Sequence, residues 1–155
     1  MNTRAKIGAV ALVALMAAGC ATVTYSSPGM LDGVSMKGVK DAKSCQAVLI
    51  NTSGFHMFWT MPLLSGDLRW NDKKKSIEGG SSFFKDQVGI AELQSALLKI
   101  AESRNCDLAD VNYFDGDASY AGLSYGGVVG SCFGSSHMSV SAILVPRKTA
   151  NKEGK

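Results

Sequence analysis

The sequence has no apolar run long enough to cross a membrane as a helix, and it lacks the short motifs that mark common enzymes. A spanning helix needs about 20 apolar residues, whereas the longest run here, residues 7–18, has about a dozen. No Cys-x-x-Cys pair, phosphate-binding glycine loop or dinucleotide fingerprint is present. We therefore expect no metal, no cofactor and no catalytic residues, because the sites that hold such groups depend on those spacings.

A large excess of charge of one sign is also absent. The chain has 16 basic and 13 acidic residues, a formal net charge of +3. Removal of segment 1–19 would take away Arg4 and Lys6, which leaves 14 basic residues against 13 acidic ones, or +1. The one basic cluster, Lys73-Lys74-Lys75, is typical of a solvated loop. Because nucleic-acid-binding proteins carry a basic face or stripe, we expect no nucleic-acid partner.

The N-terminus has the layout of an export signal, with basic residues, a short apolar core and then small residues. Residues 17–20, Ala-Ala-Gly-Cys, resemble a bacterial lipobox, although Ala17 stands where that pattern usually has Leu. The resemblance implies cleavage before Cys20, transfer of diacylglycerol to its thiol, and acylation of its amine by a fatty acid such as palmitate. Two alternatives are a plain signal peptide, cut near Gly19 or Ala21, and an uncleaved anchor.

The residue after the lipobox bears on the destination. Many lipoproteins that stay at the inner membrane have Asp there, and this chain has Ala21. The resemblance therefore implies a lipid-anchored, periplasm-facing protein of the outer membrane, held by several acyl chains that each add about 0.8 kcal/mol per buried methylene. We expect four segments: a signal peptide (1–19), a lipidated tether (20–32), a single domain (33–146) and a disordered polar tail (147–155).

The residue pattern predicts a small α+β domain. We expect an open antiparallel or mixed β-sheet with one main amphipathic helix packed across it, in the order strand(s)–helix–strand–strand. The expected strands are residues 34–39, 45–51, 108–114 and 137–145. Breaks are expected at 51–54 and 115–117, a long polar insert at 65–85, and bends and bulges in the Gly- and Ser-rich segment 116–136.

One segment has clear helical periodicity. Its apolar residues share one face of a 3.6-residue repeat: Ile90, Leu93, Leu97, Ile100 and Ala101. Asp86 is a suitable N-cap, since its carboxylate can accept from free amides of the first turn. Arg104 and Asn105 suit the other end, where Asn tolerates a left-handed conformation.

Three cysteines follow Cys20, and an exported protein meets a compartment in which disulfides persist. If the strands that follow Cys45 and Cys106 are parallel, both residues lie at the same end of the sheet. Cys45–Cys106 is then the preferred disulfide and Cys132 the free thiol. The other pairings stay open, because connectivity cannot be deduced from sequence alone.

Three groups of residues raise the question of chemistry. The pairs His56-Met57 and His137-Met138 contain copper-ligand types, but adjacent strand residues point to opposite faces, so core Met and edge His explain them. Cys132 precedes His137 by five residues, which suggests a nucleophile and its base, yet no hydrolase surroundings accompany them. The acidic residues between 107 and 117 lack EF-hand spacing and suit turns.

The segment FHMFWTMPLL, followed by Leu68 and Trp70, concentrates apolar and aromatic side chains. Part of it must enter the core, and core packing alone is one interpretation. The alternative is a partner-binding patch that includes Trp59 and Trp70, because Trp is favoured at binding hot spots.

The segments SCQAVLI, SGD, AELQSALLKIAES and DLADVNYF, within about residues 40–115, resemble small bacterial envelope lipoproteins, of which the TRL-like lipoproteins are the nearest group. The resemblance implies an envelope location and a strand–helix–strand–strand domain, and it carries over no functional residue. The leading hypothesis is a non-enzymatic outer-membrane lipoprotein whose domain binds another envelope component. The alternative is a small periplasmic redox or copper-handling protein that uses Cys132 or the His-Met pairs.

Overall fold

The structure is a computed structural model that describes residues 20–27, 29–33, 39, 42–57, 61–125 and 128–147, without the side chains of 42, 117–125 and 128–133. The predicted signal peptide, nearly all of the predicted strand 34–39, and residues 148–155 of the tail lie outside the described residues. The elements are β1 (Ala21–Tyr25), η1 (Ala42–Ser44), β2 (Gln46–Met57), β3 (Met61–Asn71), β4 (Ser76–Phe83), α2 (Ile90–Ser103), β5 (Cys106–Tyr125) and β6 (Val128–Pro146).

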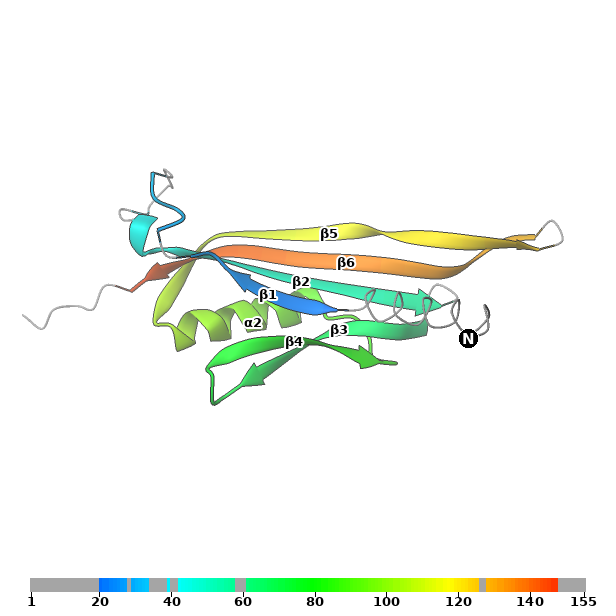
Figure 1. Cartoon of the computed structure of the whole chain (residues 1–155), viewed down its shortest axis with the longest axis horizontal. Coiled ribbons are helices and arrows are strands. Elements are labelled where there is room, and N and C mark those ends of the chain that lie inside the picture. The colour runs from blue at the N-terminus through cyan, green and yellow to red at the C-terminus, as the bar shows by residue number, and fades with distance from the viewer. Residues whose placement is uncertain are drawn as a thin grey trace, which may run out of the picture.

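The strands form one open antiparallel sheet of six strands, with α2 between β4 and β5 in the chain (Figure 1). Along the sheet the order is β4-β3-β2-β6-β5, and β1 pairs with β2 outside this path. Every strand pair is antiparallel. The predicted α+β class, with one helix on an open sheet, is confirmed.

β2 is the strand around which the sheet is organised. One edge pairs with β6 over its whole length, from Gln46 to Met57. The other edge is shared: its first part pairs with β1 and its last part, from Gly54 on, pairs with β3. A register shift between Phe55 and His56 marks the region where β3 leaves β2. From there β3 continues as a hairpin with β4, and β1 packs closely against this hairpin.

The core lies between α2 and the inner face of β2 and β6. Alternate residues of the two strands are buried on that face, as the period of 2 requires. They are Val48, Ile50, Val140, Ala142 and Leu144. The helix contributes Leu93, Ala96, Leu97, Ile100 and Ala101. Four of the five predicted helix residues are therefore buried, whereas Ile90, the first residue of the helix, is half-exposed.

The two ends of α2 differ in how well the sequence predicted them. Asp86 is not the N-cap; the cap is Gly89, whose amide N donates to Glu92 Oε2 at 2.6 Å. The helix starts later because Val88 is buried in the core, which draws the chain inward before the first turn. At the other end, Asn105 has a φ of 53°, the left-handed conformation predicted for it.

The predicted tether is wrong in its first part, because β1 follows Cys20 directly. Ala21 is buried, and the strand pairs with β2 from Ala21↔Thr52 to Tyr25↔Val48. The sequence ATVTY is rich in β-branched and aromatic residues, which favour strands. The backbone of Cys20 is also held: its amide N donates to Ser53 Oγ at 3.2 Å, and Ser53 N donates to its carbonyl at 3.0 Å.

The predicted polar insert at 65–85 is also wrong, since these residues belong largely to the β3–β4 hairpin. Leu68 and Trp70 alternate on β3 and pack against the core, together with Ile77 of β4. Apart from the exposed Phe83 and Phe84, the remaining residues are polar or glycine, because β4 is an edge strand and because β1 lies close against it. The Lys73–Lys75 cluster is an exposed turn, in which Asn71 Oδ1 accepts from two backbone amides.

Two predicted breaks are continuous strand. β2 passes through 51–54, where buried Thr52 donates its hydroxyl to Met138 O at 3.1 Å. β5 passes through 115–117 and, with β6, forms a two-stranded ribbon beyond the Met57↔Phe133 pair, where β2 ends. Register shifts at Ala109/Asn112, Gly116/Ser119 and Ala121/Gly122 agree with the bulges predicted for part of this region.

The predicted Cys45–Cys106 disulfide is not formed in the structure, and the pairing stays a prediction. Cys45 precedes β2 and Cys106 opens β5, and these strands are parallel to each other as the prediction required, with β6 between them. Cys106 is a buried thiol that donates to Arg104 O at 3.3 Å, and its burial raises the pKa of the thiol.

The close approach of β1 and β4 leads to a stability prediction. A Cβ on Gly79 would lie 1.9 Å from Ala21 O, whereas a Cβ on Gly80 would have its nearest neighbour 4.0 Å away. Gly79→Ala must push β1 off the hairpin, and we expect a loss of about 2 kcal/mol or more in the free energy of unfolding. Gly80→Ala is the matched control and should change it by less than about 0.5 kcal/mol. Urea denaturation of both variants measures the difference, and equal stabilities would contradict the packing of β1.

Candidate binding groove

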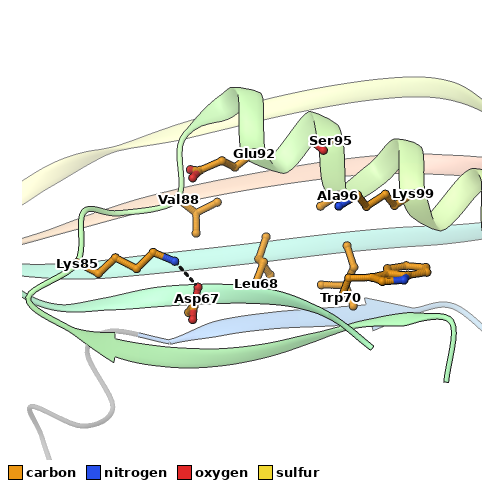
Figure 2. A pocket seen from close by; sticks show the side chains of 10 residues that line it. Asp67, Leu68, Trp70, Lys85, Val88, Glu92, Ser95, Ala96 and Lys99 are labelled. Carbon is orange, nitrogen blue, oxygen red and sulfur yellow. Dashed lines mark hydrogen bonds and ion pairs between the residues drawn. The ribbon is translucent and has the colours of Figure 1, made fainter. Parts of the chain in front are cut away.

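A groove runs between α2 and the β3–β4 hairpin. Its inner part is a hollow of about 190 Å³, lined by residues of both elements and of the loop that joins them (Figure 2). Leu68, Trp70, Ile77, Val88 and Ala96 form an apolar floor. Asp67, Lys85, Glu92 and Lys99 place charges of both signs around it. An apolar floor with a few charged groups is the usual composition of a ligand site.

Trp70 joins this hollow to a second one. The outer hollow, of about 430 Å³, is lined by Trp70, Asp72, Lys75, Lys99, Glu102 and Ser103. Trp70 and Lys99 line both hollows, one from β3 and the other from α2. The Trp70 indole N donates to Asp72 Oδ1 at 2.9 Å, which fixes the ring between the two hollows.

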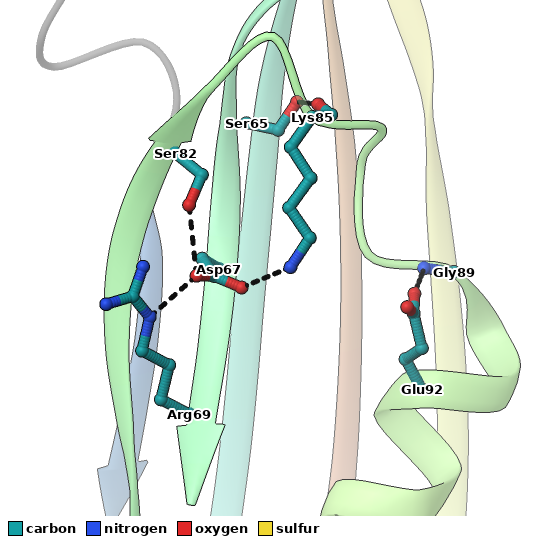
Figure 3. A network of polar contacts seen from close by, with 7 residues as sticks. All are labelled: Ser65, Asp67, Arg69, Ser82, Lys85, Gly89 and Glu92. Carbon is teal, nitrogen blue, oxygen red and sulfur yellow. Dashed lines mark hydrogen bonds and ion pairs between the residues drawn. The ribbon is translucent and has the colours of Figure 1, made fainter.

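The other end of the groove is held by Asp67, which is nearly buried (Figure 3). One carboxylate oxygen accepts from Lys85 Nζ at 2.6 Å, and the other accepts from Arg69 Nε at 2.8 Å and from Ser82 Oγ at 3.0 Å. The hydrogen bond from Lys85 is the main cause that lowers the pKa of Asp67 to about 2; Arg69 and Ser82 add to it, and burial opposes it.

This network fixes the loop between β4 and α2. Lys85 belongs to that loop, and besides its bond to Asp67 its backbone carbonyl accepts from the buried Ser65 hydroxyl at 2.6 Å. The loop is thus tied to β3 at two points, one neutral and one charge-assisted. Charge-assisted hydrogen bonds are roughly twice as strong as neutral ones, so Asp67 holds the loop in place while the helix and the hairpin form the groove walls.

The groove suits binding better than acid–base chemistry. Asp67 stays an anion at neutral pH because its pKa is far below that of a useful base, and the Glu92 carboxylate accepts from the Gly89 amide. No His or Cys is among the residues that line either hollow. Within the described ranges there is no cluster of three metal-ligating side chains and no helix long and apolar enough to cross a membrane.

The structure separates most of the residues that the sequence singled out. Trp70 lies in the groove, Trp59 lies outside the described residues, and Cys20 is exposed at the start of β1. Cys45 precedes β2 and Cys106 opens β5, so both lie at the end of the sheet that is far from Cys20. The side chain of Cys132 is not described, and its backbone belongs to β6.

The His-Met and Cys-His pairings are not supported by strand geometry. Met138 packs against the core, whereas His137 is exposed and contacts the Phe114 ring, with centroids 6.3 Å apart. The two therefore point to opposite faces, as expected for neighbours in a strand. Cys132 and His137 are five residues apart along β6, which is about 17 Å at 3.4 Å per residue and too far for a nucleophile and its base.

Sequence reasoning missed the ion-pair network of Asp67, Arg69 and Lys85. The signal was present in the alternation of Asp67, Leu68, Arg69 and Trp70, which is the pattern of a half-buried strand. It was obscured because glycines and serines on both sides suggested an irregular loop. A carboxylate that is buried beside a lysine 18 residues away cannot be recognised before the hairpin and the loop are placed.

Comparisons with protein-family models, with curated proteins and with solved structures find no match to this chain. The resemblance to the TRL-like lipoproteins, and what it implies, therefore stays a prediction.

The pKa of Asp67 leads to a prediction for acid stability. The pKa falls from an ordinary 3.8 to about 2 on folding, so the network contributes stability above pH 4 that is lost as the pH falls towards 2. Asp67→Asn should remove this dependence, on the order of 1 kcal/mol after allowance for the exposed cations. Urea midpoints between pH 2 and pH 5 measure it. Asp86→Asn, in the exposed part of the same loop, is the control and should retain the loss; a wild-type-like slope in Asp67→Asn would contradict the network.

Proposed function

We propose that this protein is an outer-membrane lipoprotein, anchored through Cys20, whose periplasm-facing domain is a non-catalytic module that binds a segment of another envelope protein in the groove at Trp70. The observation that carries the binding role is the position of Trp70, which lines both hollows between α2 and the hairpin. The anchor rests on the lipobox resemblance of residues 17–20.

The position of Cys20 supports the anchor. β1 begins at Ala21, directly after the residue that the lipobox resemblance makes the new N-terminus. Cys20 is exposed, which leaves its thiol open to acylation. An acylated amine is an amide that keeps one N–H, so the hydrogen bond to Ser53 Oγ is compatible with the lipidated N-terminus.

The chemistry of the groove supports a protein segment as the ligand. Trp70 and the apolar floor would receive an apolar side chain, since aromatic anchors in desolvated pockets dominate binding energies at protein interfaces. The outer hollow has both basic and acidic side chains at its rim: Lys75, Lys99, Asp72 and Glu102. These can pair with charges of either sign that flank the apolar side chain of the ligand. Such rim charges contribute more to partner selection than to affinity.

The anchor is tested by Cys20→Ser in cells. We expect the wild-type protein in the outer-membrane fraction and the variant absent from it, because a serine cannot take up the acyl chains that supply the membrane affinity. The mass of the N-terminal peptide of the mature protein must show diacylglycerol and a third acyl chain. An unmodified Cys20 in a protein that still fractionates with the membrane would contradict the anchor.

The groove is tested by photo-crosslinking from position 95, where Ser95 lines the inner hollow. We expect one envelope-protein adduct in intact cells, reduced about tenfold by Trp70→Ala, which corresponds to a loss of about 1.4 kcal/mol. Lys99→Glu alters only an exposed groove residue and should also weaken the adduct. Lys73→Glu, on the hairpin turn but in neither hollow, is the matched control. An adduct that is insensitive to Trp70→Ala and Lys99→Glu would contradict binding in the groove.

A further inference from the structure

The end of the sheet that holds Cys20 also holds an exposed apolar cluster. β1 and β3 run in one direction and β2 and β4 in the other, so the start of β1 and β3 and the end of β4 meet at one end. There Met61 begins β3 and Phe83 ends β4, followed by Phe84. Their exposed fractions are 48%, 61% and 73%. We name these three residues the apolar end cluster.

The cluster is close to the residue that would carry the lipid. Gly66 of β3 adjoins Cys20, since a Cβ on Gly66 would lie 2.9 Å from Cys20 O. Leu64, two residues before Gly66 on β3, pairs with Phe83, so Phe83 lies about 7 Å from Gly66 along the strand direction. No linker intervenes, because Cys20 is bonded to Ser53 and β1 starts at the next residue. Acyl chains on Cys20 would therefore bring a bilayer to within roughly 10 Å of the phenylalanines.

Phe84 is held in a left-handed conformation at the turn from β4 into the loop, where its amide N donates to Leu63 O at 3.2 Å. Its φ is 54°, a region that bulky residues rarely adopt and that costs about 1 kcal/mol or more. The ring is largely exposed, so it recovers little of that cost by packing, and its ring contact is with Phe83 at a centroid distance of 6.5 Å. Two adjacent, largely exposed aromatic rings mark a surface that something else covers.

Charged residues become fewer along the β5–β6 ribbon, beyond Asp115 of β5, which the register places level with Ala21. The ribbon projects past the end that holds the apolar end cluster (Figure 1), and residues 118–136 contain no Asp, Glu, Lys or Arg. The charged turn 72–75, together with Arg104 and Arg147, lies towards the opposite end of the strands. Beside the cluster, Lys85 is paired with Asp67, and Asp86 is exposed.

We infer that the apolar end cluster sits in the headgroup–acyl boundary of the membrane, beside the acyl chains of Cys20, and fixes the tilt of the domain on the bilayer. This inference rests on the proposed lipid anchor. Apolar side chains of interfacial proteins enter about 5–10 Å into that boundary, a depth the cluster can reach. The ribbon would lie along the interface, since open strand edges are not tolerated in hydrocarbon.

The test uses the mature lipidated protein in vesicles of phosphatidylcholine and phosphatidylglycerol that contain a brominated phosphatidylcholine. Both native tryptophans are first replaced, by Trp59→Phe and Trp70→Phe. A single Trp is then introduced by Phe84→Trp in one variant and by Leu98→Trp in the other. Leu98 is the matched control, an apolar residue of α2 that is 50% exposed. Circular dichroism and the melting temperature establish that each variant is folded, and flotation measures membrane attachment.

We expect the brominated lipid to reduce emission about twofold at Phe84→Trp and by less than about a tenth at Leu98→Trp, because quenching requires contact with the acyl region. Equal, weak quenching of the two variants in protein that floats with the vesicles would overturn the inference and leave the anchor intact. Protein that does not float, with an N-terminal peptide that lacks acyl mass, would overturn both.

A second reporter separates the role of the phenylalanines from the anchor. Met61→Trp should be quenched in the same background, and the added pair Phe83→Ser and Phe84→Asn should reduce that quenching at least about twofold. Asn is suited to a positive φ, so this pair should lower the melting temperature little or not at all. Unchanged quenching at Met61→Trp in a floating, folded protein would show that the phenylalanines do not seat the domain and would overturn their role.

Discussion

The packing of β1 against the β3–β4 hairpin is the contact on which the rest of the domain depends. The backbone of β1 approaches β3 at Gly66 and β4 at Gly79 so closely that a Cβ at either position would meet the backbone of Cys20 or Ala21. A strand of only five residues has little surface of its own. It is stable here because its edge pairs with β2 while the hairpin packs against it without side chains between.

That contact also explains the groove. β1 occupies the first part of the β2 edge, so β3 can pair with β2 only over its last residues and must diverge, carrying β4 with it. The hairpin then diverges from β2, and α2 packs against the face formed by β2, β6 and the hairpin. The gap that remains at the surface is the groove, with Trp70 along it and the Asp67–Lys85 pair at its inner end. The N-terminal strand and the proposed binding site are thus parts of one arrangement.

The sequence was sufficient to predict those elements whose residue pattern is local and strong. The helix, its left-handed end at Asn105 and the fold class follow from periodicity and composition, because each depends on neighbours within a few residues. The β3–β4 hairpin and β1 were missed because their glycines and polar residues serve contacts with distant strands. The sequence likewise placed Cys45 and Cys106 at one end of the sheet but could not show that β6 lies between their strands. The Asp67 network depends on a loop position that no residue pattern specifies.

The loss of the expected tether changes what the proposed anchor would do. A flexible segment of residues 20–32 would give the domain a reach of about 20 Å, from the usual scaling with the square root of length. Strand pairing from Ala21 on removes that freedom, because Cys20, the residue proposed to carry the lipid, is itself bonded to β2. The groove would then be held at a fixed height above the membrane and in a fixed orientation, instead of moving over the range that a flexible tether would allow. A partner segment would have to reach that height above the same membrane, so the geometry of β1 would select for partners that are themselves anchored or close to the bilayer.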